Sequence, residues 1–285
     1  MNKSMKKLTV FFEAIKFEHT LFALPFAYIG AFLGNRGWPG WGIIGWMTLA
    51  MVGARTLGMA LNRVIDLDID KKNPRTSNRA LPQGLLSSRF VWFTIIVSIG
   101  LFEWASFHLN RTCLWLSPIA VFLLFIYSYT KRFTWLSHVV LGVVIACAPL
   151  GGSIAATGGI SFPVIILGVA VTFWLAGFDI IYACLDYEFD KKERLYSIPA
   201  IFGIPFALKI SVFFHVITFI ALVLTGVLLG LSFWYYIGTI LAGLLLLYQH
   251  SIVSPKDLSR LNTAFFTANA SLSVMLFFFV VLSFW

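Results

Sequence analysis

Charged residues are scarce in this sequence. Of its 285 residues, 12% are charged and 59% are hydrophobic, and the mean hydropathy is +0.88. A soluble domain carries roughly twice that charged fraction. The chain lacks the polar shell that would be needed to cover so much apolar surface in water, so lipid must be the solvent for most of it. The composition therefore excludes an ordinary soluble domain and predicts a polytopic membrane protein.

Cysteine is scarce as well. Cys113, Cys147 and Cys184 are scattered through apolar segments without paired spacing. This spacing excludes a disulfide framework and a cysteine zinc site, and the three residues are expected to behave as small buried hydrophobes. Basic motifs are absent outside the loops that join the apolar segments, so no nucleic-acid partner is expected.

Long apolar runs are what the sequence has in abundance. A spanning helix needs about 20 mostly apolar residues. The sequence predicts an all-α membrane protein with about nine transmembrane helices, at residues 20–35, 41–61, 90–109, 112–130, 137–157, 161–182, 205–229, 232–249 and 262–284. Residues before the first span are expected to form a short amphipathic helix on the membrane surface, without cleavage. The whole chain, 1–285, is expected to be one transmembrane domain.

The positions of lysine and arginine predict the orientation, because short loops rich in these residues stay on the cytoplasmic side. With the N-terminus inside, the outer loops contain only Arg36 and Arg111. The remaining loop charges lie in five inner segments, namely 1–19, 62–89, 131–136, 183–204 and 250–261. We therefore expect an inner-membrane protein with an outside C-terminus. Its net charge of +9 is concentrated beside the anionic lipid of the cytoplasmic face.

The acidic residues are placed just as unevenly. Most lie in two inner stretches, "NRVIDLDIDKKNPRTSNRALPQG" at 62–84 and "DIIYACLDYEFDKKERLYSIP" at 179–199. These stretches follow the second and the sixth expected span. The chain thus reads as two loosely repeated four-helix halves plus one helix, with an acidic cluster at the same place in each half. Repeats of this kind commonly place a site at their interface.

The spacing within each cluster predicts a face of oxygen ligands. Residues four apart on a helix point roughly the same way, which applies to Asn62, Asp66 and Asp70 and to Tyr182, Asp186 and Asp190. Asp68 and Glu188 point elsewhere and are expected to be solvated. Mg²⁺ prefers such oxygen ligands and binds through one or two carboxylates plus substrate phosphates. Two opposed faces therefore predict a diphosphate site bridged by Mg²⁺.

Basic residues near the clusters are expected to contact the remaining phosphate oxygens. Arginine offers a bidentate fork and lysine a point charge. The candidates are Arg75, Arg79, Lys131, Arg132 and Lys191.

Three stretches carry a family resemblance. "RTLGMALNRVIDLDIDKKNPRTSNRALPQG" resembles the first aspartate-rich motif of the UbiA superfamily of intramembrane aromatic prenyltransferases. "YACLDYEFDKK" resembles its second motif. "YSYTKRF", at 127–133, resembles the Y-x-x-x-K-R element that the family has after the fourth span. Two positions depart from the family pattern. Arg63 stands where the family has aspartate, which removes one possible ligand, and Ala80 stands where it has proline, which alters the rigidity of the loop.

The resemblance implies an Mg²⁺-dependent enzyme similar to 4-hydroxybenzoate polyprenyltransferases. It would transfer a polyprenyl group from polyprenyl diphosphate to a small aromatic acid in quinone biosynthesis. The acceptor is expected to be 4-hydroxybenzoate, with a dihydroxynaphthoate as the alternative. The catalytic set is Asp66, Asp70, Asp186, Asp190 and Asp179, and the metal ligands are Asn62 and the first four of these aspartates.

Other residues have narrower expected roles. Asp179 is a candidate for the base that removes the ring proton. Arg55 would pair with a carboxylate on the aromatic substrate or with an aspartate, and the sequence does not separate these two roles. Tyr127 and Tyr182 are expected to line the substrate site. His19 is a candidate for substrate contact or for an interfacial anchor.

A transporter is the main rival from another class. Transporters place ionisable groups and broken helices near the midplane of the membrane. Here the ionisable groups gather at one face, beside an inner loop (62–89) long enough to form a lid. A nonenzymatic scaffold would not need matched aspartate clusters. The enzyme is therefore the favoured interpretation.

Overall fold

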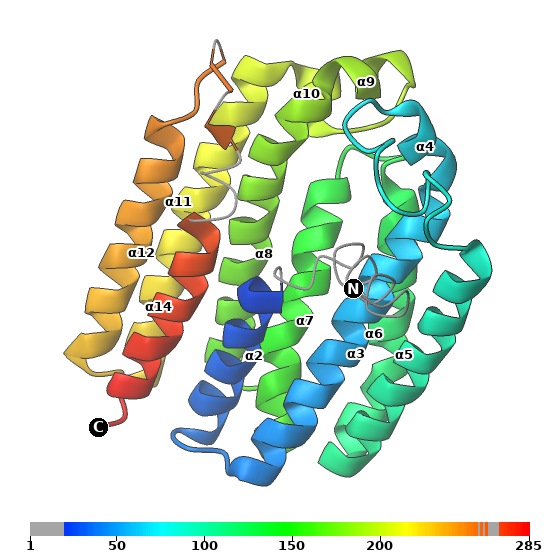
Figure 1. Cartoon of the computed structure of the whole chain (residues 1–285). Helices are drawn as coiled ribbons and strands as arrows, with labels where there is room; N and C mark the ends of the chain where they lie inside the picture. Colours follow the sequence, from blue (N-terminus) through cyan, green and yellow to red (C-terminus); the bar gives the residue numbers. More distant parts are fainter. Residues whose placement is uncertain (1–19, 256, 259, 262–267) are drawn as a thin grey trace, which may run out of the picture.

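The computed structural model describes residues 20–255, 257–258, 260–261 and 268–285. Within these ranges the chain is a bundle of helices (Figure 1). The helices that cross the bundle are α2 (Thr20–Asn35), α3 (Trp41–Ile65), α5 (Ser88–Leu109), α6 (Arg111–Thr130), α7 (Ser137–Thr157), α8 (Phe162–Ala183), α11 (Ile204–Leu229), α12 (Phe233–Ser251) and α14 (Asn269–Leu282). Three short helices, α4 (Leu67–Lys72), α9 (Tyr187–Lys192) and α10 (Ile198–Phe202), complete the set.

A helix lies at each of the nine expected spans in the part of the chain that the structure describes. Six stretches are long and apolar enough to cross a membrane, namely α3, α5, α6, α7, α11 and the stretch Phe162–Lys192 that contains α8. Within the described residues α2 and α14 are shorter apolar helices, and α12 is not among the six. The all-α, multi-pass class is confirmed, whereas nine crossings stay a prediction. The expected surface helix before α2 lies outside the described residues.

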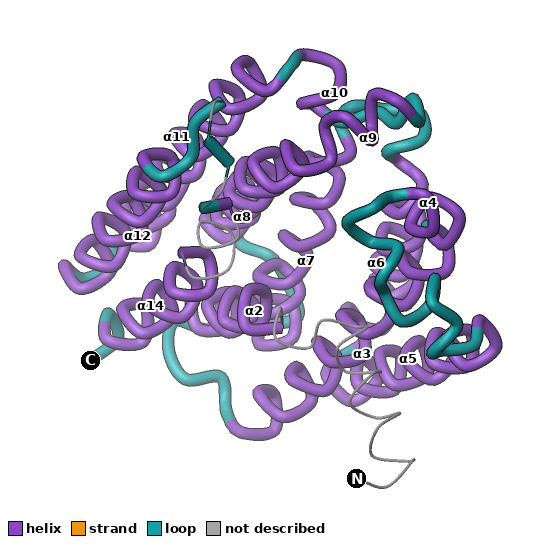
Figure 2. The backbone as a smooth tube through the Cα atoms, turned by 45° about the horizontal axis from the view of Figure 1, so that its top comes forward, coloured by secondary structure: helices purple, strands orange, loops and turns teal. Residues whose placement is uncertain are grey.

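Helix α7 packs between α2 and α8, and its glycines let its backbone approach theirs closely. A Cβ on Gly152 would lie 2.0 Å from the carbonyl oxygen of Ala27 on α2. On the other side, a Cβ on Gly142 would lie 2.2 Å from the carbonyl oxygen of Thr172 on α8. Helices in lipid associate by such close van der Waals packing. The glycines therefore fix α2, α7 and α8 as a tight central layer, visible in Figure 2.

Asn110 shows how the far end of the bundle is fixed. Its side-chain oxygen accepts a hydrogen bond from the Cys113 amide (2.9 Å) and caps α6. Its amide nitrogen donates to the carbonyl oxygen of Ile154 on α7 (2.7 Å). One side chain thus satisfies a helix N-terminus and ties the turn between α5 and α6 to α7.

The three short helices lie at one end of the bundle, where α3 and α8 end, and the C-terminus lies at the opposite end (Figure 1). Both acidic clusters are carried by this short-helix end. The prediction that the two clusters meet on one face is therefore confirmed, and this end is called the polar end below.

Candidate active site

Each acidic cluster begins at a break between two helices. Asp66 separates α3 from α4, with φ −92° and ψ 5°. Asp186 precedes α9 after a single 3₁₀ turn, with φ −101° and ψ 6°. Both backbones lie in the sparsely populated bridge region, where active-site residues often sit. The single helical face expected from the spacing is thus interrupted at the same point in both clusters.

Asp66 is buried at the polar end, with only 2% of its surface exposed. Its Oδ2 accepts hydrogen bonds from the Asn62 amide (2.8 Å) and from Lys131 Nζ (2.6 Å). Its Oδ1 is buried without a hydrogen-bond partner among the described residues, although Arg132 Nη2 lies 3.4 Å away. Asp66 therefore keeps one oxygen free to accept a further bond.

Asp70 is held by arginines on both sides. Arg79 Nη1 lies 2.8 Å from each carboxylate oxygen. Arg63 Nη1 lies 3.9 Å from Oδ2, and the Arg63 side chain is buried. The arginine that departs from the family pattern therefore adds positive charge beside Asp70, where the pattern would have a further acid.

Asp186 in the second cluster takes its partners from the loop after the first cluster. The Asn73 amide donates to Oδ1 (2.9 Å), and Arg75 forms a fork onto both oxygens, with Nε 2.8 Å from Oδ1. Arg75 Nη1 also donates to the Tyr182 hydroxyl (2.8 Å). Burial alone would lower the pKa of Arg75, but the hydrogen bond and the charge of Asp186 outweigh it, so the pKa is raised. The loop thus joins the two halves across the polar end.

The remaining predicted residues of the second cluster are less tightly bound. Asp190 lies within electrostatic range of Asp186 and Lys131. Lys191 is exposed, and its Nζ lies over the ring of Tyr187, 5.7 Å from the centroid. The structure therefore places Asp190 with the cluster but not Lys191.

The residues expected to be solvated are also as predicted. Asp68 and Glu188 are both exposed. His19 lies outside the described residues, so its role stays a prediction.

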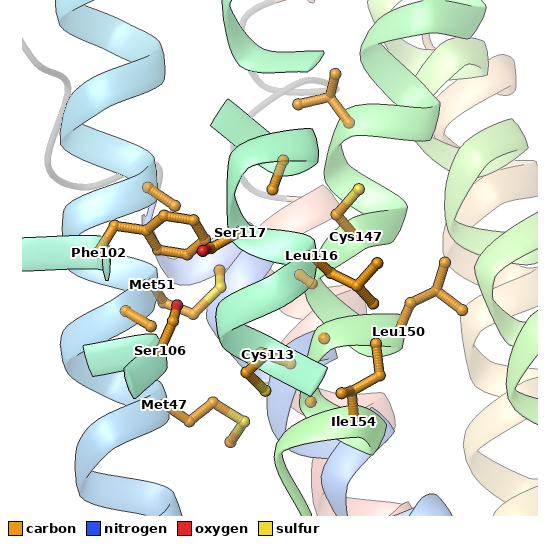
Figure 3. Close-up of a pocket in the computed structure, with 18 of the residues that line it drawn as sticks. Met47, Met51, Phe102, Ser106, Cys113, Leu116, Ser117, Cys147, Leu150 and Ile154 are labelled. Atoms are coloured by element: carbon orange, nitrogen blue, oxygen red, sulfur yellow. The ribbon is translucent and has the colours of Figure 1, made fainter. Parts of the chain in front are cut away.

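An apolar cavity of about 280 Å³ lies between α2, α3, α5, α6 and α7 and extends to Leu109 and Ile154 at the far end of the bundle. Figure 3 shows Met47 and Met51 of α3 facing Cys113 and Ser117 of α6 across it. Among the described residues that line the cavity, Arg55 of α3 is the single charged one.

Arg55 forms no ion pair or hydrogen bond with an aspartate in the described part of the chain, and its Nε is buried without a partner. Tyr127 lies within electrostatic range of Arg55, Asp66 and Asp179. Of the two roles left open for Arg55, the pairing with an aspartate is not present in this structure.

Asp179 contacts a histidine that the sequence did not single out. His138 Nδ1 lies 2.7 Å from Asp179 Oδ2, and the amide of Ile198 donates to His138 Nε2 (3.3 Å). Asn73 was missed as well, although its place three residues after Asp70 in "DKKNPR" was a usable signal.

The donors at the polar end suit Mg²⁺. Among the described residues, no three histidine, cysteine or acidic side chains cluster as a metal cage. Each of Asp66, Asp70 and Asp186 is instead paired with a cation. Mg²⁺ needs no cage of three protein ligands, because it binds one or two carboxylates and completes its shell with phosphate oxygens and water. The free Oδ1 of Asp66 is a hard oxygen ligand of the right kind.

The fold and the site define a class, namely a multi-pass membrane enzyme with a charged site above an apolar cavity. Residues 23–282 match the UbiA prenyltransferase family. The chain belongs to this family and is a prenyltransferase.

Known proteins similar to the chain agree with this assignment. It is 26% identical over 253 residues to a 4-hydroxybenzoate octaprenyltransferase of Francisella tularensis subsp. mediasiatica, covering 88% of each chain. It is 28% identical to the Yersinia pseudotuberculosis enzyme of the same name, covering 89% of this chain and 87% of the other.

Solved structures show the same fold. A UbiA homologue from Aeropyrum pernix K1 is 33% identical, with a TM-score of 0.85, over 93% of this chain and 98% of that one. A UbiA homologue from Archaeoglobus fulgidus, solved with GPP and Mg²⁺, is 22% identical, with a TM-score of 0.72, over 95% of this chain and 99% of that one.

Proposed function

We propose that the protein transfers a polyprenyl group from polyprenyl diphosphate to 4-hydroxybenzoate, with Mg²⁺, at the cytoplasmic face of the inner membrane. The observation that carries the proposal is the Arg55 guanidinium, which lines the apolar cavity and is paired with no carboxylate of the described chain. A buried arginine is a bidentate partner for the carboxylate of an aromatic acid. The names of the similar Francisella and Yersinia proteins favour 4-hydroxybenzoate among such acids.

The diphosphate belongs at the polar end. Mg²⁺ ions would each be held by one or two carboxylates among Asp66, Asp70, Asp186 and Asp190, with Asn62 beside them, and when bound they would stabilise the charge on the leaving diphosphate. The A. fulgidus homologue, solved with GPP and Mg²⁺, supports the pairing of a prenyl diphosphate with this ion. Arg75, Arg79, Lys131 and Arg132 surround the same carboxylates and offer donors to phosphate oxygens.

The prenyl tail belongs in the cavity. Its lining is apolar apart from Arg55 and a few small polar side chains. Leu116 and Ile119 of α6 line the cavity and are also exposed on the outer surface of the bundle, at 38% and 55%. A tail too long for about 280 Å³ can therefore pass between helices into lipid at this point.

The transfer needs a dry site and a base. The bond between the allylic carbon and the diphosphate oxygen breaks, and the diphosphate leaves with the electron pair. A ring carbon of the acceptor then bonds to the allylic carbon, and the ring proton passes to Asp179. Tyr127, within electrostatic range of both Arg55 and Asp179, would offer an aromatic surface to the positive charge on the allylic group.

A product assay tests the proposal. The detergent-purified protein would receive a long-chain prenyl diphosphate with 4-hydroxybenzoate or with a dihydroxynaphthoate, in Mg²⁺ or in EDTA. We expect a prenylated 4-hydroxybenzoate only with Mg²⁺. Product from the naphthoate alone would correct the acceptor. Binding of the diphosphate without product from either acceptor would contradict the proposed reaction and favour a transporter.

A further inference from the structure

His138 is a buried histidine that joins three helices beside Asp179. It lies in the first turn of α7, and 5% of its side chain is exposed. Its Nδ1 meets Asp179 of α8 at 2.7 Å, and its Nε2 meets the amide of Ile198, the first residue of α10, at 3.3 Å. Every polar atom of the imidazole is therefore engaged.

The hydrogen bonds assign the tautomer. The Ile198 amide can only donate, so His138 Nε2 must accept and carries no proton. The ring proton then lies on Nδ1 and is donated to Asp179 Oδ2. Because Nε2 is engaged, His138 has no free site for another proton. It cannot act as the base itself, but it orients the carboxylate that does.

Asp179 has one oxygen bound and the other available. Its Oδ1 has no hydrogen-bond partner within the described residues, and 24% of the side chain is exposed, compared with 5% for His138. It lies within electrostatic range of Tyr127, which is also in range of Arg55 and Asp66. Asp179 and Arg55 are thus both near Tyr127, and the proposed function places the acceptor beside Arg55.

We propose that His138 is a positioning residue for the transfer reaction. It holds Asp179 Oδ2 so that Oδ1 takes the proton from the ring carbon that has bonded to the allylic carbon. The electron pair of that C–H bond restores the aromatic ring, and Asp179 becomes a neutral acid until it releases the proton to water. This inference rests on the proposed function, because it deepens the role of Asp179 in that reaction.

Glutamine and leucine at position 138 separate positioning from packing. Glutamine has an amide that donates to Asp179 and a carbonyl that accepts from Ile198, whereas leucine does neither. We expect His138→Leu to lower kcat by about 10- to 100-fold, a part of the roughly 10²- to 10⁴-fold that a general base contributes. His138→Gln should stay within about threefold of wild type, and the KM values of both substrates within about threefold in both variants.

A double-mutant cycle tests whether His138 acts through Asp179. Asp179→Asn alone should lower kcat by about 10²-fold or more. Adding His138→Leu to Asp179→Asn should then cost nothing further, because residues that act as a unit are not additive. A second full loss in the double variant, or equal rates for the leucine and glutamine variants, would overturn the inference.

Two controls keep the outcomes distinct. Thermal melting in detergent and Mg²⁺-dependent binding of geranyl diphosphate should be unchanged in the glutamine variant. If leucine impairs folding, His138→Met replaces it, because its flexible side chain fills similar space but donates no hydrogen bond to Asp179; wild-type kcat in that variant would equally overturn the inference. A wild-type protein that makes no product would refute the proposed function and this inference together. Wild-type product with an unaffected leucine variant would refute the inference alone.

Discussion

The two aspartate clusters have similar backbone conformations but differ in their surroundings. Each has a six-residue helix, "LDIDKK" or "YEFDKK", that begins directly after an aspartate with nearly the same dihedral angles. Asp66 and Asp70 are 2% and 4% exposed. In the second cluster, 16% of the Asp186 side chain is exposed, and α9 contains no buried residue. The same sequence pattern therefore produces a buried cluster in one half and an open one in the other.

The origin of their partners explains the difference. Asp66 and Asp70 bind Asn62, Lys131 and Arg79, which all come from the first predicted half. Asp186 binds Asn73 and Arg75, which come from the loop after the first cluster. The first cluster is thus assembled within its own half, whereas the second depends on a loop from the other. We infer that a change in this loop affects the second cluster first.

The largest expected effect is the loss of an aspartate. Asp66→Asn and Asp186→Asn should each lower kcat/KM by about 10²- to 10³-fold or more, because each removes charge from the group proposed to hold Mg²⁺. Steady-state prenylation of 4-hydroxybenzoate measures this, with Asp68→Asn, at an exposed acid two residues away, as the matched control. Near-normal turnover in both variants would remove the metal assignment.

The stabilities of the Asp66→Asn and Asp186→Asn variants also test the difference in burial between the two clusters. Breaking a buried ion pair costs about 3–5 kcal/mol, and a more exposed pair costs less. Asp66→Asn should therefore lower the melting temperature in detergent more than Asp186→Asn does. Equal melting temperatures would show that the difference in burial has no energetic consequence.

The next effect concerns the acceptor and Arg55. Arg55→Leu should raise the KM for 4-hydroxybenzoate by about 30-fold or more, since truncating one partner of a buried charge pair costs about 2–5 kcal/mol. The KM for prenyl diphosphate should change by less than about threefold. Arg55→Lys keeps the charge but loses the bidentate fork, so its KM for 4-hydroxybenzoate should lie between those of wild type and Arg55→Leu. A rise only in the KM for prenyl diphosphate would show that Arg55 binds the diphosphate and not the acceptor.

A smaller effect is expected from the loop that joins the clusters. Arg75→Lys should raise the KM for prenyl diphosphate by about tenfold, because lysine cannot form the fork onto Asp186. Arg79→Lys is the matched variant for the first cluster. If the loop supports mainly the second cluster, the Arg75 variant should be the more sensitive to low Mg²⁺ in a titration of activity. Equal Mg²⁺ dependence would contradict that asymmetry.

The smallest effect is expected at the outer edge of the polar end. Lys72 Nζ lies 2.8 Å from Glu193 Oε2, and this hydrogen bond raises the pKa of Lys72. The pair also joins the two clusters, but the lysine side chain is 63% exposed. Exposed ion pairs contribute little. Lys72→Met should therefore keep activity within about twofold at low and at high salt; a larger, salt-sensitive loss would show that this bridge helps to hold the halves together.

Much of the site was predictable because local spacing carried it. The repeated acidic spacing identified Asp66, Asp70, Asp186 and Asp190, and positive-inside counting placed both clusters on one face. The solvated positions of Asp68 and Glu188 followed from helical geometry. Lys191 was grouped with the diphosphate ligands by proximity in sequence alone, and the structure leaves it exposed over Tyr187.

Other features have no local signal. His138 and Asp179 are 41 residues apart, and no spacing rule joins them. The breaks at Asp66 and Asp186 were also not expected, because both segments have an uninterrupted helical pattern. The loose repeat was inferred from the placement of acids, yet α2 of the first half packs closely against α7 of the second through Gly152.

By itself, the sequence determined that lipid surrounds most of the chain, where the helices lie, and that both acidic clusters are at one end of the bundle. It also supplied the residue types that suit a diphosphate with Mg²⁺. These follow from composition, from hydrophobic run length and from periodicity, which are properties of neighbouring residues. Only the tertiary structure decided which cation meets which aspartate, that Arg55 lines an apolar cavity, and that His138 contacts Asp179. Those contacts depend on how glycine-mediated helix packing brings distant segments together, and local sequence does not specify that packing.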